Sequence, residues 1–434
     1  TASALKLQYL AYSIAQADLD AKLSADQSLT LKVNATELNV GPLTKADMEL
    51  NGTGSLQNHK LAFKVADRNQ QIELSLSGGL GTASTSAKTK AQTASATWHG
   101  HIEHLAVNHP MLGPWFSKAP SSLRASATEI QLGELCLVQE QDSAPASLCV
   151  ALNFNDDTIK LNGDIQGLSL NRFSAGLPPG SSLQGKVDSE FNVAGKLDQL
   201  TGQFALTAAP ILIRYQAGVD EAALEHHASL SANASLKDNQ IRSEMAFVIA
   251  EVGSMTGTLN TRGLDPGSAI EGSVSSQFDN LFWLGGFFPE LEKLDGSLNA
   301  DLAINGSVAA PALVGAVGLD NLHMQLPAIG LALNSGSASL HLANAGDWQL
   351  DAGISSGAGR INLIGQGVFE PSNGPTGNIA ISGENFTAVD LADAKVLISP
   401  DINISLAAEL IKIRGSLAIP QGNFTLKSLP TQAS

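Results

Sequence analysis

The stretch Leu298-Asn-Ala-Asp-Leu-Ala-Ile304 places apolar side chains at every second position and mostly polar ones between them. Because successive side chains of a strand point to opposite faces, this pattern predicts a β-strand with one apolar and one polar face. The same period recurs in Leu29–Val33 and Ile72–Leu76, and Gly- or Asn-rich breaks such as Asn305-Gly306 follow the alternating segments. Such breaks are typical of turns in antiparallel sheets, and helical periodicity is almost absent. The sequence therefore predicts an all-β protein.

An internal repeat extends this pattern. Leu183–Gly195 matches Leu294–Gly306 at a constant offset of 111 residues, so that apolar positions fall on apolar positions. Each copy follows an aperiodic apolar segment and a proline-containing break. Repeats of this kind indicate a quasi-one-dimensional array of strands, for which we expect about 25 to 30 strands at a spacing of about 4.8 Å.

Several segments depart from the alternation. We expect residues 107–116, 168–173 and 281–288 to form short helices or apolar loops that cap one end of a sheet. Residues 81–97 are rich in Ala, Ser and Thr, and we expect a mobile surface loop there, with a linker as the lesser alternative. On this basis the chain divides into segments 1–106, 107–280 and 281–434.

Composition limits the possible functions. The 434 residues are 43% hydrophobic and 15% charged, and 25 Lys and Arg stand against 41 Asp and Glu, for a net charge of −16. This balance disfavours a binding site for nucleic acid or for an anionic membrane surface. No apolar run reaches the roughly 18 to 20 residues that a membrane-spanning helix needs. The chain begins at Thr1 without a signal-like segment, so we expect a mature form or a fragment.

The two cysteines lie on neighbouring alternating segments. Cys136 and Cys149 are separated by a polar stretch, so two strands joined by a loop, with the hairpin spanning residues 130–154, would bring them face to face. A disulfide there would add about 3 kcal/mol in the chain-entropy model. Two buried free thiols are the alternative, and neither cysteine belongs to a CxxC pair. The disulfide, and with it an oxidising compartment, is the better interpretation.

Catalytic and metal-binding signals are weak. Gly353-Ile-Ser-Ser-Gly357 matches the GxSxG pattern by letter, but strand alternation resumes after it, where a nucleophile elbow needs a helix. His99 and His101 would share one strand face and His104 and His109 follow, yet an exposed polar strand end explains them better than a zinc site. We therefore expect no catalytic residues, no metal, no cofactor and no enzyme activity.

The apolar face of the sheet must be covered or used. Aromatic side chains are few and no amphipathic helix could serve as a lid, so we expect an elongated sheet that curls along its length around an apolar trough. Acyl chains would gain about 0.8 kcal/mol per buried methylene in such a trough. For each candidate, ordinary packing against the opposite wall is the alternative to contact with lipid. The candidate groove residues are Val187, Phe191, Val193, Leu298, Leu302, Ile304, Leu340, Leu342, Ile361, Leu363, Ile402, Ile404 and Leu406.

Specific motifs carry a resemblance to a known family. The cysteine segments Glu134-Leu-Cys-Leu137 and Ser147-Leu-Cys149, the Leu-x-Gly openings after proline breaks, and the tail from Ala394-Lys-Val-Leu-Ile-Ser-Pro-Asp-Ile402 through Gly415-Ser-Leu-Ala-Ile-Pro-Gln421 to Pro430 resemble the TamB family, in the C-terminal half. The resemblance covers about Trp98 to Pro430. It implies a β-taco or repeating β-groove fold of the AsmA-like group, in a protein that is anchored in the inner membrane and crosses the periplasm. It also implies a TamA-like partner, an Omp85-type barrel of the outer membrane. We expect both the anchor and the final segment that meets the barrel to be missing from this chain.

Three functions remain open besides an enzyme. The favoured one is a periplasmic conduit that passes phospholipid acyl chains toward the outer membrane. The second is an assembly factor or holdase that accepts strands of outer-membrane or autotransporter proteins by β-augmentation. The third is a β-solenoid adhesin with a closed, dry core.

Overall fold

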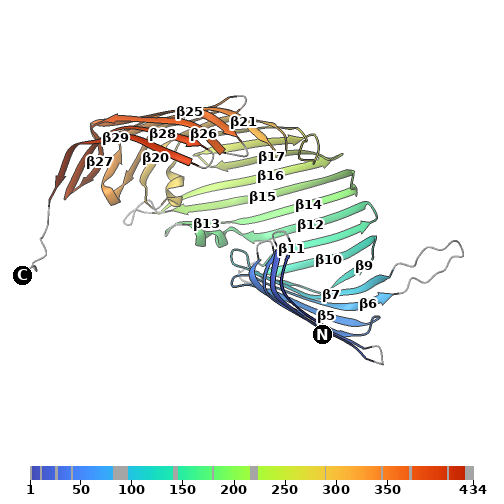
Figure 1. The fold of residues 1–434 in the computed structure, drawn as a ribbon. Coiled ribbons are helices and arrows are strands. Elements are labelled where there is room, and N and C mark those ends of the chain that lie inside the picture. The colour runs from blue at the N-terminus through green and yellow to red at the C-terminus, as the bar shows by residue number, and fades with distance from the viewer. Residues whose placement is uncertain are drawn as a thin grey trace, which may run out of the picture. The chain divides into compact units, whose positions relative to one another are not determined.

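The computed structural model describes most of the chain (Figure 1). The described residues are 2–9, 12–24, 28–40, 43–81, 96–139, 145–177, 180–215, 223–288, 290–343, 346–370, 374–407 and 410–425. They form 29 strands of one sheet and three 3₁₀-helices, and no α-helix occurs among them. The expected all-β fold, a long antiparallel sheet with few short helices, is confirmed.

The first strands in chain order are β1 (Ala2–Tyr9), β2 (Tyr12–Leu23), β3 (Leu29–Val40), β4 (Leu43–Gly54), β5 (His59–Ala66), β6 (Gln71–Gly81), β7 (Thr97–His109), β8 (Gly113–Ser117), β9 (Ser121–Ala125), β10 (Glu129–Gln139), β11 (Ala146–Asn155) and β12 (Thr158–Ser169). Next come η1 (Leu170–Gly176), β13 (Ser182–Gln184), β14 (Lys186–Lys196), β15 (Gln199–Tyr215), β16 (Leu224–Lys237), β17 (Gln240–Ile249), β18 (Gly253–Thr261), β19 (Ile270–Phe278), η2 (Phe282–Phe287) and β20 (Glu292–Gly306). The last are β21 (Pro311–Leu326), η3 (Pro327–Ile329), β22 (Leu331–Leu333), β23 (Ser335–Leu342), β24 (Asp347–Ser356), β25 (Gly359–Glu370), β26 (Gly374–Glu384), β27 (Phe386–Leu391), β28 (Ala394–Ala407) and β29 (Leu410–Phe424).

Each strand pairs antiparallel, mostly with its neighbour in sequence. Some strands are broken in two, so that β8 and β9 both pair with β7 and β10, and β22 and β23 both pair with β21. The contacts divide the chain into a first unit, residues 1–172 and 186–205, and a second unit, residues 173–185 and 206–434. The three-segment division made from the sequence stays a prediction.

The aperiodic segments have two different outcomes. Residues 168–173 and 281–288 lead into η1 and η2, which are the short helices expected. The expectation for residues 107–116 is wrong, because β7 continues to His109 and β8 begins at Gly113. Gly113 takes a φ of 66°, a left-handed conformation that glycine adopts in a tight turn without steric cost. Trp115 then pairs across the turn with Val107 and is buried in the sheet.

The internal repeat has a counterpart in the backbone. Gly185 and Gly296 occupy the same position in the two copies, and both take positive φ, at 141° and 137°. At Gly185 the chain passes from β13 to β14, and near Gly296 the pairing of β20 with β21 shifts register. Both copies thus interrupt the ladder at the same point after a 3₁₀-helix, as bulges do in antiparallel sheets.

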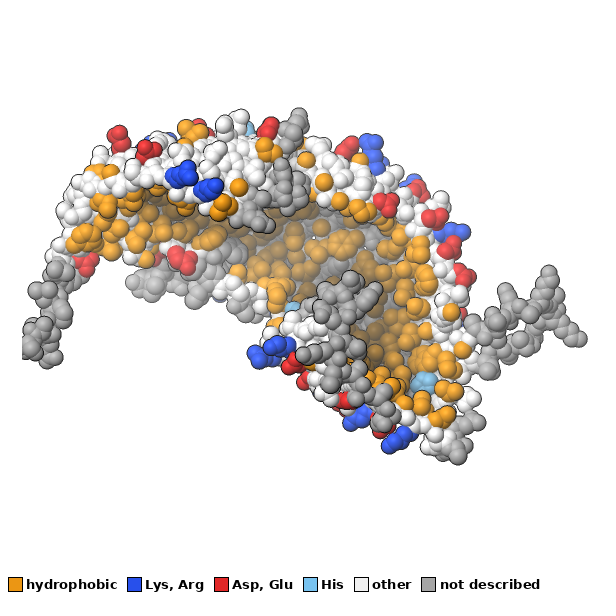
Figure 2. All heavy atoms as spheres, in the orientation of Figure 1, with side chains coloured by type: hydrophobic (Ala, Val, Ile, Leu, Met, Phe, Trp, Pro, Cys, Tyr) orange, Lys and Arg blue, Asp and Glu red, His pale blue; other side chains and the backbone are white. Residues whose placement is uncertain are grey.

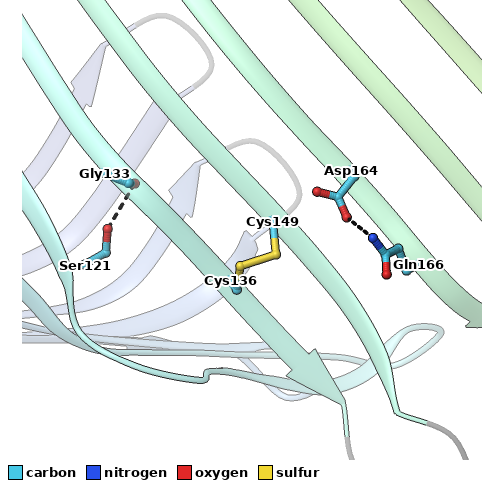
Figure 3. The surroundings of a disulfide bond; sticks show 6 residues. All are labelled: Ser121, Gly133, Cys136, Cys149, Asp164 and Gln166. Atoms are coloured by element: carbon cyan, nitrogen blue, oxygen red, sulfur yellow. Dashed lines mark hydrogen bonds between the residues drawn. A yellow bond between two sulfur atoms is a disulfide. The ribbon is translucent and has the colours of Figure 1, made fainter.

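The two cysteines join neighbouring strands. Cys136 of β10 lies directly opposite Cys149 of β11, with 4.1 Å between the Cα atoms, and the two form a disulfide (Figure 3). Cys149 is in turn paired with Asp164 of β12, on the polar face of the sheet. The disulfide inferred from the sequence is therefore present, and neither cysteine is free.

The expected loop 81–97 falls largely outside the described residues. β6 ends at Gly81 and β7 begins at Thr97, and residues 82–95 between them are not described.

Candidate functional site

The apolar positions of the second unit form continuous rows across the strands. Residues that pair directly in an antiparallel ladder carry their side chains on the same face. One row runs from Leu302 of β20 through Leu342 and Trp348 to Leu406 of β28. Neighbouring rows contain the other candidates Leu298, Ile304, Leu340, Ile361, Leu363, Ile402 and Ile404. All of these side chains therefore lie on one face, which we call the inner face.

The inner face of the second unit holds an open apolar cavity of about 990 Å³. The candidates Ile304, Leu340, Leu342 and Leu406 line it. Its polar lining side chain is Thr261, whose hydroxyl already accepts a hydrogen bond from the backbone N–H of Ile241 at 3.0 Å. The full lining is Leu259, Thr261, Ile270, Ile304, Val308, Pro311, Ala312, Leu313, Leu340, Leu342, Gly346, Trp348, Leu350, Phe369, Pro375, Ile379 and Leu406. The cavity therefore offers hydrocarbon contact and almost no hydrogen bonding.

Further along the same strands the inner face is covered by the chain itself. Leu333 of β22, Ile361 of β25 and Phe386 of β27 form a buried cluster, against which Leu363 and Ile398 pack. The short strands β22 and β27 contact one another over this part of the sheet. Ile361 is 9% exposed, whereas the other groove candidates are half-buried. Ile361 and Leu363 therefore pack against other side chains of the protein, which was the alternative to contact with lipid. Leu340 and Leu342 border the open cavity.

The first unit repeats the apolar inner face. Val193 of β14 pairs with Leu161 of β12, Phe191 pairs with Gly163, and Val187 pairs with Leu168. The row continues from Leu161 through β11, β10, β9, β7 and β6. A buried cluster of Leu38, Ala46 and Val65 packs another part of this unit.

Hydrophobic and charged side chains separate by face. Figure 2 shows that hydrophobic side chains gather on the hollowed faces of the sheet, and that Lys, Arg, Asp and Glu side chains lie mainly outside these hollows. The ion pairs of the described residues, such as Lys64 with Glu73 at 2.8 Å, are at the surface, where they contribute little to stability. The hydrogen bond from Lys64 lowers the pKa of Glu73, and the backbone N–H groups of Asn69 and Gln70 lower that of Asp67. These groups make the outer face hydrophilic.

The described residues offer few clusters of side chains that could bind a metal or act in catalysis. His99 and His101 share the polar face with Ser122 and Arg124 and are exposed. The described residues contain no group of three or more His, Cys, Asp and Glu side chains that could hold a metal ion. Within the same residues, no helix has the length and apolar character needed to cross a bilayer.

Several cavity residues escaped the sequence analysis. Trp348 and Leu350 lie opposite Leu342 and Leu340 in the β23–β24 hairpin, and Ile379 follows two strands later. Their alternation is visible in Asp347-Trp-Gln-Leu350, so the register of this hairpin could have revealed them. Phe369 and Pro375 carry no comparable signal, because they flank residues 371–373 at the end of a hairpin.

Comparisons with known proteins agree with the fold and its motifs. A family model described as "TamB, N-terminal domain" matches residues 1–319, and one described as "TamB C-terminal domain" matches residues 349–434. "Translocation and assembly module subunit TamB" of Haemophilus influenzae is 22% identical over 445 aligned residues, which cover 100% of this chain and 32% of that protein. The chain thus spans about a third of the length of this relative. The first family model alone covers well over half of the chain, so the chain belongs to the TamB family.

Proposed function

We propose that this chain is part of a periplasmic conduit for phospholipid, in which acyl chains lie on the inner face while head groups stay in water. The observation that carries the proposal is the open cavity of about 990 Å³, whose lining side chains are apolar apart from the Thr261 hydroxyl and the Trp348 indole N–H, which both already take part in hydrogen bonds. An acyl chain gains about 0.8 kcal/mol for each methylene that leaves water, and the cavity asks for no hydrogen bond in return.

An acyl chain can move along the inner face because the apolar side chains of one row resemble each other. Leu340 and Leu350 present similar aliphatic side chains on neighbouring strands about 4.8 Å apart, and Ile379 continues the row two strands later. An acyl chain that shifts along this row exchanges apolar contacts for other apolar contacts, so its free energy changes little. We propose that lipid slides in this way between the inner and outer membranes.

The proposed membrane anchor and partner of the conduit are based on the resemblance to the TamB family. We propose that the full-length protein is anchored in the inner membrane, and that a TamA-like Omp85 barrel receives it at the outer membrane. The disulfide between Cys136 and Cys149 supports an oxidising compartment such as the periplasm.

Mass spectrometry of the purified 434-residue chain tests this function. Native spectra and organic extraction should detect co-purifying phospholipid in stoichiometric amount, and delipidated chain should take it up again from vesicles of phosphatidylethanolamine and phosphatidylglycerol. A chain that carries no lipid and takes up none would refute the conduit.

One observation favours a second function. Among the described residues β29 has a strand on one side only, β28, and its side chains are exposed, with Ile411 at 65% and Ile413 at 66%. Such an edge can accept a further strand by β-augmentation. An assembly factor or holdase for outer-membrane or autotransporter proteins would use it in this way, in line with the name of the Haemophilus influenzae relative. The same mass spectra separate the two functions, since a holdase would retain peptide in place of lipid.

A further inference from the structure

The indole of Trp348 lies over glycines of the neighbouring strands at the border of the cavity. Trp348 is 7% exposed although it lines the cavity, and its Nε1–H donates to the carbonyl oxygen of Thr376 at 3.1 Å. This hydrogen bond satisfies the ring's polar atom, which would otherwise face hydrocarbon. The ring therefore lies over β25 and β26, and the small part of it that remains exposed lines the cavity.

Glycines make the space in which the ring lies. A methyl group at Gly365 would stand 2.9 Å from Cζ3 of Trp348, and one at Gly377 would stand 2.9 Å from Cζ2. The atoms nearest to the added methyl at Gly365 all belong to side chains, those of Trp348, Ile379 and Leu350. Gly365 is also outside the positive-φ residues, so the backbone there accepts alanine. A side chain at Gly365 would have to displace the indole, and the open direction is into the cavity.

The first unit contains the same arrangement independently. Trp98 covers Gly78 and Gly100, where added methyl groups would lie 2.6 Å and 2.5 Å from its ring. Its Nε1–H donates to Nε2 of His59 at 2.9 Å. Two tryptophans on two inner faces thus each lie over two glycines of the sheet, and each indole N–H donates a hydrogen bond.

We propose that Gly365 and Trp348 set the free cross-section of the cavity and so limit the bulk of the hydrocarbon that it accepts. This inference rests on the function proposed above and assigns one of its specificity-determining pairs. With the ring flat, an unbranched acyl chain passes over it. With the ring raised, the same chain loses contact with the wall beyond Trp348.

Binding of oleate to the delipidated 434-residue chain, measured by calorimetric titration, tests the pair. We expect Gly365→Ala to weaken binding about 15-fold, the loss that corresponds to two methylene groups excluded from the cavity. Gly318→Ala is the matched control, because Gly318 lies on the polar face of β21 with no atom closer than 4.0 Å to an added methyl. The double variant Trp348→Leu/Gly365→Ala should bind oleate as the unsubstituted chain does, since no ring remains to be raised.

A second variant leaves the glycine in place. Trp348→Phe enlarges the cavity, and we expect it to increase the affinity for branched phytanic acid relative to oleate. Equal oleate binding by Gly365→Ala and Gly318→Ala, or an unchanged preference in Trp348→Phe, would overturn the inference while leaving the conduit intact. Failure of the unsubstituted chain to bind oleate would overturn the hydrocarbon site itself, and the inference with it.

Discussion

Replacing Leu340 by aspartate should block the cavity without unfolding the sheet. Leu340 lies between Val317 and Leu350 in one apolar row and is half-buried, so a carboxylate there can stay hydrated by water in the open cavity. If its hydration shell keeps about three methylenes from the wall, at about 0.8 kcal/mol each, lipid binding loses about 2.4 kcal/mol, or about 50-fold in affinity. The assay is uptake of phospholipid from vesicles by the delipidated chain, followed by mass spectrometry.

The neighbouring residue supplies the control. His341→Asp introduces the same side chain into the same strand one position away, where the side chain is exposed on the polar face. The two variants place the same residue in the same strand and change the net charge by the same amount, and they differ in the face that receives the carboxylate. Circular dichroism should show equal strand content. Equal lipid uptake by Leu340→Asp and His341→Asp would refute the assignment of the inner face as the binding surface.

Three further sets of substitutions have expected outcomes. Replacing Cys136 and Cys149 by serine should lower the free energy of unfolding by about 3 kcal/mol, and a reductant should lower the wild-type value equally while leaving the variant unchanged. Tyr215→Phe should raise that free energy at neutral pH by about 1 kcal/mol, because the hydroxyl is buried without a hydrogen-bond partner among the described residues. Burial raises the pKa of Tyr215 to about 12, so the wild type should also lose stability from about pH 10, where the unfolded phenol ionises, up to about pH 12, and the phenylalanine variant should lack this loss in parallel urea titrations. Ile361→Ala should cost about 2 to 4 kcal/mol of stability with no change in bound lipid, and reduced lipid in this variant at full stability would contradict its place in the packed cluster.

The strand content and the sidedness of this protein could be read from its sequence. Period-two alternation is a local property, since neighbouring side chains of a strand point in opposite directions wherever the strand lies. For this reason Leu298 and Leu302 could be placed on one face of their strand, and Leu340 and Leu342 on one face of theirs, without coordinates. The pairing of Cys136 with Cys149 was accessible for the same reason, because both sit in one short hairpin whose register is local.

Tertiary structure decided which part of the apolar face is open. Ile361 and Leu340 belong to the same kind of alternating pattern, yet β22 and β27 fold back over Ile361 and leave Leu340 beside the cavity. Likewise the position of the Trp348 ring depends on Gly365 and Gly377, which reach it only through the pairing of β24, β25 and β26. Alternation reports the direction of a side chain from its own strand, whereas access to that side chain depends on segments far away in the sequence.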